Sequence, residues 1–87
     1  MLKITKTGES GDDVLLILEG KVTQQWAALL DGVCRGYLAE EKIVRLDCAG
    51  VDFVDARGAA VLKTFLRDRV TLLNAPCFVT QTILIGE

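Results

Sequence analysis

The feature that most constrains the fold is a helical stripe of apolar residues that follows a fully apolar segment. Between positions 26 and 38, apolar residues recur at i, i+3, i+4, i+7, i+8, i+11 and i+12, which is the spacing of one helix face. The stripe consists of Trp26, Leu29, Leu30, Val33, Cys34, Tyr37 and Leu38. Val14–Leu18 is apolar at every position, which is typical of a central strand covered on both faces. A buried strand followed by an amphipathic helix predicts an α/β domain.

The remaining segments complete an alternation of strands and helices. Three more segments have strand character, namely Leu2–Thr7, Ile43–Asp47 and Val70–Asn74. A turn over 8–13 predicts that the first of them forms a hairpin, whereas 49–54 is interpreted as a short connection. A second helix is expected with its apolar face at Ala59, Leu62, Phe65 and Leu66, and a short third helix over Cys77–Ile85, where a strand is an equal alternative.

The order β-β-α-β-α-β-α predicts a small sandwich with a mostly parallel four-stranded sheet. The N-terminal strand should be an antiparallel edge strand, because a hairpin joins it to the next strand. The two later strand-to-strand crossovers should be right-handed, with helices mainly on one side of the sheet. A length of 87 residues fits a single domain over 1–87.

Charge and patterning limit the partners and the compartment. The net charge of −2 gives no general attraction to nucleic acid. No apolar run approaches the roughly 20 residues of a membrane span, so direct membrane insertion is not expected. The segment Met1–Lys6 lacks the apolar core and cleavage site of a signal peptide, which favours a cytoplasmic location.

The residues that catalysis and metal binding most often use are scarce. The chain has no histidine. It has an odd number of cysteines, and none of the three has CxxC spacing; they are Cys34, Cys48 and Cys77. We therefore expect free thiols, with Cys34 and Cys48 serving as small buried hydrophobes. A nucleophilic enzyme needs a base beside its nucleophile, and no phosphate-binding or dinucleotide-binding glycine motif occurs. Neither an enzyme nor a cofactor or metal is expected.

One group of carboxylates lies where α/β proteins usually bind ligands. Asp47, Asp52 and Asp55 follow predicted strands, and open α/β sheets place ligand sites at the carboxyl ends of their strands. Carboxylates alone rarely make an enzyme, so the group is a candidate site without an assigned reaction.

The segment from Val44 to Gly58 carries the most specific signal. It reads as an apolar strand that ends in Asp47, a short loop, an apolar pair, and then Asp55-Ala56-Arg57-Gly58. This segment resembles the signature of the STAS family, the sulphate-transporter and anti-sigma-factor-antagonist domains, in which Asp-Ser-Ser/Thr-Gly opens a helix. The turn Leu18–Val22 resembles the family's Gly-Glu-Leu or Gly-Arg-Leu turn. The resemblance spans about residues 2 to 86 and implies a STAS-like fold that binds proteins; members usually continue with another strand and helix, so a shortened far sheet edge is expected.

Elementary physical chemistry gives the same motif a structural role. Asp55 suits an N-cap, because its carboxylate can accept hydrogen bonds from the free amides of a helix start. Gly58 would let the helix approach a neighbouring backbone closely. Thr23 is the corresponding N-cap candidate for the first helix. A purely structural turn would use these residues in the same way.

The two residues inside the motif depart from the family pattern. In the sporulation and stress-response antagonists, the residue after the aspartate is a serine or threonine that a kinase-type anti-sigma factor phosphorylates. Here that residue is Ala56, which has no hydroxyl group to accept phosphate. Arg57 opposes the helix dipole by about 0.3–1 kcal/mol, which suggests a partner contact or, alternatively, an exposed ion pair with Asp52 or Asp55.

The leading hypothesis is a non-phosphorylatable STAS regulator, an anti-sigma factor antagonist-like protein that binds a kinase-type anti-sigma factor. The candidate surface joins Asp55, Ala56, Arg57 and Gly58 to the Glu19–Gln24 turn, which carries Lys21 and Thr23. The alternative is an accessory subunit of an ABC-type lipid transporter that holds the transporter ATPase. A vestigial or scaffolding domain is the third interpretation, and a weak homodimer is compatible with each of them.

Overall fold

The structure is a computed structural model that describes residues 1–65 and 70–85. Its elements follow the predicted order. They are β1 (Leu2–Ser10), β2 (Asp13–Val22), α1 (Gln24–Ala39), β3 (Ile43–Val54), α2 (Ala56–Phe65), β4 (Val70–Leu73) and α3 (Cys77–Ile85). Leu66, expected on the second helix, lies outside the described residues.

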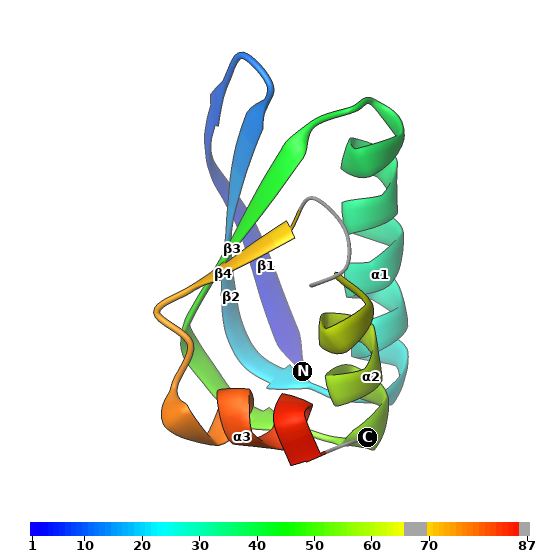
Figure 1. The fold of residues 1–87 in the computed structure, drawn as a ribbon, viewed down its shortest axis with the longest axis vertical. Helices are drawn as coiled ribbons and strands as arrows, with labels where there is room; N and C mark the ends of the chain where they lie inside the picture. Colours follow the sequence, from blue (N-terminus) through cyan, green and yellow to red (C-terminus); the bar gives the residue numbers. More distant parts are fainter. Residues whose placement is uncertain (66–69, 86–87) are drawn as a thin grey trace.

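The sheet has the predicted topology. Its four strands lie in the order β1-β2-β3-β4, with β1 antiparallel to β2 and the other two pairings parallel. Helices α1 and α2 lie side by side over one face of the sheet, and α3 lies at the end where β2 and β3 finish (Figure 1). Within the described ranges, no helix is long and apolar enough to cross a membrane.

The core lies between this sheet and its helices. Val14, Leu16 and Leu18 of β2 are almost completely buried, as are Val44, Leu46 and Cys48 of β3. The helices contribute Ala27, Leu30, Cys34, Ala59, Leu62 and Phe65. Because the helices cover one face, Leu15 and Ile17 on the other face are only half-buried. The central position predicted for Val14–Leu18 is confirmed, but its burial on both faces is not.

The segment expected as a connection over 49–54 is part of a strand. β3 continues to Val54 and stays paired with β2 as far as Val22, with register shifts between Ile17 and Glu19 and between Gly20 and Lys21. These irregularities break the alternation of buried and exposed positions on which a strand prediction depends. The long strand brings Val54 beside Val22, directly before the starts of α2 and α1.

The stripe on α1 faces the sheet with one exception. Leu30 and Cys34 are buried, and Trp26, Val33, Tyr37 and Leu38 pack against the core as half-buried residues. Leu29, however, is 49% exposed, and Ala27, which was not assigned to the stripe, is fully buried. The helix therefore faces the sheet with its Ala27–Leu30–Cys34 side and leaves Leu29 at the margin beside β1.

Candidate functional site

The candidate site forms where two parallel strands end and two helices begin. Val22 and Val54 are register partners at the ends of β2 and β3. α1 begins two residues after Val22, and α2 begins two residues after Val54. The Asp55 backbone amide donates a hydrogen bond to the Val22 carbonyl oxygen over 3.2 Å, which joins the two chain segments just before their helices.

Asp55 caps both helices. One carboxylate oxygen, Oδ1, accepts a hydrogen bond from the Gly58 amide of α2 at 2.7 Å. The other, Oδ2, accepts one from the Gln24 amide at the start of α1 at 3.1 Å. Amides in the first turn of a helix have no partner within the helix, so this half-buried carboxylate satisfies one at each helix start. The predicted N-cap role of Asp55 is present, and it extends to a second helix.

Thr23 occupies the N-cap position of α1 without capping it through its side chain. Its backbone is extended, with φ −133° and ψ 146°, and its side chain forms no cap hydrogen bond. Its carbonyl accepts hydrogen bonds from the amides of Trp26 and Ala27. Gln24, which follows, has a φ of +37°, a backbone conformation that residues other than glycine adopt only rarely. The predicted N-cap position of Thr23 is confirmed, but its hydroxyl forms no capping hydrogen bond. The first amide of α1, that of Gln24, donates to the Asp55 carboxylate instead.

Gly58 permits the close approach expected of it. It is buried, and a Cβ atom at this position would overlap the carbonyl oxygen of Val22 and lie 3.0 Å from the carbonyl carbon. The first turn of α2 therefore packs directly on the backbone end of β2, a contact that excludes every side chain larger than that of glycine.

Ala56 and Arg57 lie exposed at the start of α2. Within residues 1–65 and 70–85, Arg57 takes part in no ion pair. The two carboxylates considered as its partners have other contacts: Asp52 pairs with Lys21 at 3.3 Å, and Asp55 accepts the two helix amides. The exposed ion pair predicted as an alternative for Arg57 is not formed.

Lys21 and Phe53 form an exposed pair beside the helix starts. The Lys21 Nζ lies 5.8 Å from the centroid of the Phe53 ring, within the range of a cation–π contact. Phe53 is 50% exposed although it is a large aromatic residue. The sequence signal for it was the apolar pair Phe53-Val54, but only Val54 enters the core. Whether a member of such a pair faces solvent depends on the irregular pairing of β3, so sequence reasoning did not assign Phe53 to the site.

The three aspartates expected to gather at the strand ends have separate partners. Asp47 accepts a hydrogen bond from the Ala49 amide at 3.1 Å, Asp52 pairs with Lys21, and Asp55 caps the helices. In the described part of the chain, no group of three or more candidate ligand residues could hold a metal ion. Asp47 and Asp55 thus bind backbone amides and Asp52 binds a lysine side chain, so the three carboxylates do not converge on one point.

Two of the three thiols are buried, and burial raises their pKa values. Burial, with a smaller effect from Asp31, raises the pKa of Cys34 to about 12. Burial, with a smaller effect from Asp47, raises the pKa of Cys48 to about 11. All three cysteines are free, as predicted, and Cys77 is the exposed one. What the site offers chemically is a contact surface made of a fixed helix start, the cations Arg57 and Lys21, and an exposed aromatic ring.

The mixed four-stranded sheet with its helices on one side has a STAS-like fold. Among solved structures, the chain is similar to the anti-sigma factor antagonist SpoIIAA in its unphosphorylated form. The TM-score is 0.74 at 13% sequence identity, over 97% of this chain and 84% of that one. A second structure, described as Mglu, matches 75% of this chain but only 18% of its own length, with a TM-score of 0.63 and 24% identity. The TM-scores show a shared fold, and at these identities the likeness extends to the fold alone. No protein-family model matches the sequence, and no curated protein matches it significantly.

Proposed function

We propose that this chain is a non-catalytic STAS regulator that binds a partner protein through the exposed start of α2, and that phosphorylation at this helix start does not switch the binding off. The observation that carries the proposal is Ala56, exposed at the helix start that Asp55 and Gly58 fix in place. The structural likeness to SpoIIAA, an anti-sigma factor antagonist, supports a kinase-type anti-sigma factor as the partner.

The electrostatics of the helix start explain why an alanine at position 56 would keep this surface able to bind its partner at all times. A phosphate on residue 56 would add nearly two negative charges beside the Asp55 carboxylate, at the position that the partner contacts. Alanine leaves the surface small and neutral there. Arg57 lies next to it with no ion-pair partner among the described residues and is therefore free to meet an acidic group on the partner.

The test begins with affinity capture from native cells and continues with titration calorimetry against the captured partner. Ala56→Asp should weaken binding at least tenfold, about 1.4 kcal/mol, while the thermal melt stays close to that of the parent. Arg57→Ala should weaken binding less, mainly through the association rate, because charges at the rim of an interface act by steering. Ala39→Asp places the same charge at the exposed far end of α1 and should leave binding unchanged.

Three results would change the proposal. Parent-like binding by Ala56→Asp would move the interface elsewhere. Unfolding of that variant would leave the motif with a structural role alone. Capture of a transporter ATPase in place of an anti-sigma factor would keep the surface and assign the chain to lipid transport. Incubation with ATP and a captured kinase should leave the whole chain unlabelled.

A further inference from the structure

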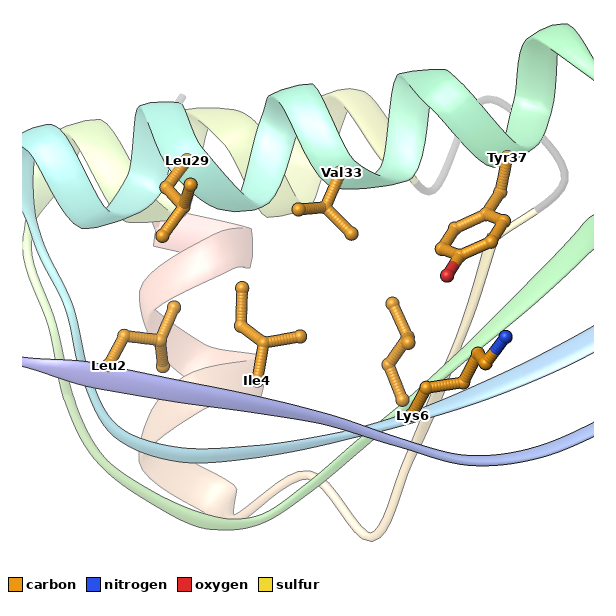
Figure 2. A pocket seen from close by; sticks show the side chains of 7 residues that line it. Leu2, Ile4, Lys6, Leu29, Val33 and Tyr37 are labelled. Atoms are coloured by element: carbon orange, nitrogen blue, oxygen red, sulfur yellow. The ribbon is translucent and has the colours of Figure 1, made fainter.

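An open groove of about 340 Å³ lies between strand β1 and helix α1. Its lining consists of Leu2, Ile4, Lys6, Leu16, Leu29, Val33 and Tyr37. Leu2 and Ile4 point from the strand toward the helix, and Leu29, Val33 and Tyr37 point from the helix toward the strand (Figure 2). The exposed Leu29 lies in this lining. The groove is therefore an apolar trough along the edge of the sheet.

The strand beside the groove also presents free backbone groups. β1 is an edge strand of the sheet. The Lys21 amide donates a hydrogen bond to the Met1 carbonyl oxygen, and the register pairs Leu2 with Gly20. Because antiparallel pairs alternate between bonded and non-bonded residues, the amides and carbonyls of Leu2, Ile4 and Lys6 point away from β2. These are the β1 residues whose side chains line the groove.

The length of this free edge is set by a bulge. The pairing of β1 with β2 shifts register between Lys6 and Gly8, and a bulge bends the strand and ends its regular edge. Leu2–Lys6 is thus a regular edge of five residues, about the length of an average strand. An extended segment added there would place alternate side chains in the groove.

The charge along this edge is positive. Leu2–Lys6 carries Lys3 and Lys6 and no carboxylate. Lys6 pairs with Glu9 at 2.9 Å, but Glu9 also pairs with Lys42, so one carboxylate serves two ammonium groups. Lys3, which alternates with Leu2 and Ile4, lies on the opposite face of the sheet and is exposed. An added segment would therefore meet an apolar groove on one face and, on the other, Lys3, whose register partner on β2 is the exposed Glu19.

We propose that the β1 edge and its groove bind an extended segment of a partner protein in which apolar and acidic residues alternate. The apolar residues would enter the groove beside Leu29 and Val33, and the acidic residues would lie beside Lys3 on the other face. A second copy of the chain fits this edge less well, because antiparallel pairing of two Leu2–Lys6 segments brings four lysines and no carboxylate of those segments together. None of the groove-lining residues belongs to the start of α2, so the proposal does not depend on the function proposed above.

The test uses a fluorescent peptide of four Val-Glu repeats and a matched peptide of four Val-Lys repeats, with binding followed by anisotropy. The Val-Glu peptide should bind at least about tenfold more tightly than the Val-Lys peptide, and it should shift the amide resonances of Leu2, Ile4 and Lys6. Lys3→Glu should remove this preference. Equal binding of the two peptides, or no binding of either, overturns the proposal and leaves the lysines as protection of an exposed edge.

Two matched pairs of variants locate the binding. Lys6→Pro removes an amide that points away from β2, a position where an edge strand tolerates proline, whereas Lys6→Ala removes the charge and keeps the amide. Lys6→Pro should weaken the Val-Glu peptide about tenfold more than Lys6→Ala does. Leu29→Asp should weaken it, and Ala28→Asp, at an exposed neighbouring position of α1, should not. Circular dichroism confirms that each variant is folded.

Sedimentation velocity tests whether a second copy of the chain, rather than a partner segment, occupies the β1 edge. A concentration-dependent dimer that Lys6→Pro abolishes would assign the edge to a second copy and overturn the proposal. None of these variants changes Ala56 or Arg57, so a captured partner that binds the start of α2 should still bind the Lys6→Pro chain. The two proposals can therefore fail independently.

Discussion

The Asp55 carboxylate accepts a hydrogen bond from the Gln24 amide although the two residues are 31 positions apart in the sequence. The same carboxylate accepts the Gly58 amide within its own turn. One side chain thus holds the starts of α1 and α2 together and fixes the surface on which Ala56 and Arg57 lie.

Replacement of Asp55 should destabilise the whole domain. Asp55→Ala should lower the free energy of unfolding by about 2 kcal/mol, the upper range for loss of one N-cap, because both helix starts lose an acceptor. Asp52→Ala removes only the exposed pair with Lys21 and should cost less than about 1 kcal/mol. Urea unfolding followed by circular dichroism measures both. Equal effects of the two substitutions would show that the double cap contributes little.

Replacing glycine with alanine should lower the stability of the fold at one position and raise it at two others. Gly58→Ala should destabilise the fold by about 1–3 kcal/mol, the usual cost of overpacking, because the new methyl group meets the Val22 carbonyl. Gly32 and Gly36 lie on α1 with nothing within 4 Å of an added Cβ. Gly32→Ala and Gly36→Ala should each stabilise the chain by about 0.5–1 kcal/mol, since alanine favours helix. Thermal melts of the three variants compare these effects, and a neutral Gly58→Ala would contradict the close packing of α2 on β2.

The buried thiols should make stability fall at alkaline pH. Below a pH of about 9 the Cys34 thiol is protonated in both states, so it causes no pH dependence there. Above that pH the unfolded chain releases the proton, whereas the folded chain retains it until about pH 12. The stabilising effect is lost across this window, and the unfolding free energy should fall by about 1 kcal/mol between pH 9 and 10 from this thiol alone.

The Cys34→Ala variant isolates this contribution. Other groups titrate in the same range, so the parent and the variant are compared by urea unfolding at each pH, and the parent should lose about 1 kcal/mol more. If the unfolding free energy falls equally with pH in the parent and the variant, burial does not raise the pKa of the Cys34 thiol.

Leu29 and Leu30 should differ strongly although they are neighbours in one predicted stripe. Leu30 is fully buried, so Leu30→Ala should cost about 2–5 kcal/mol. Leu29 is half exposed at the margin of the groove, and Leu29→Ala should cost less than about 1 kcal/mol. Chemical denaturation of both variants tests this, and equal losses would mean that α1 is rotated relative to the orientation described.

The local sequence determined most of the elements and their order. The period of the apolar residues separated the helix at 26–38 from the strand at 14–18, because each periodicity follows from backbone geometry alone. The Asp55-Ala56-Arg57-Gly58 motif located the start of α2, because capping and glycine preferences act over a few residues. These features predicted the topology and the cap on α2.

Only the tertiary structure decided which residues meet across the chain. The Asp55–Gln24 hydrogen bond, the length of β3 and the exposure of Phe53 depend on how β3 pairs with β2, including its register shifts. Leu29 is exposed while Ala27 is buried because the rotation of α1 on the sheet is set by packing, and both residues fit a helical pattern. Sequence periodicity determines which side of an element is apolar. Which neighbour covers that side, and how completely, depends on contacts between residues far apart in the sequence, and no local pattern contains that information.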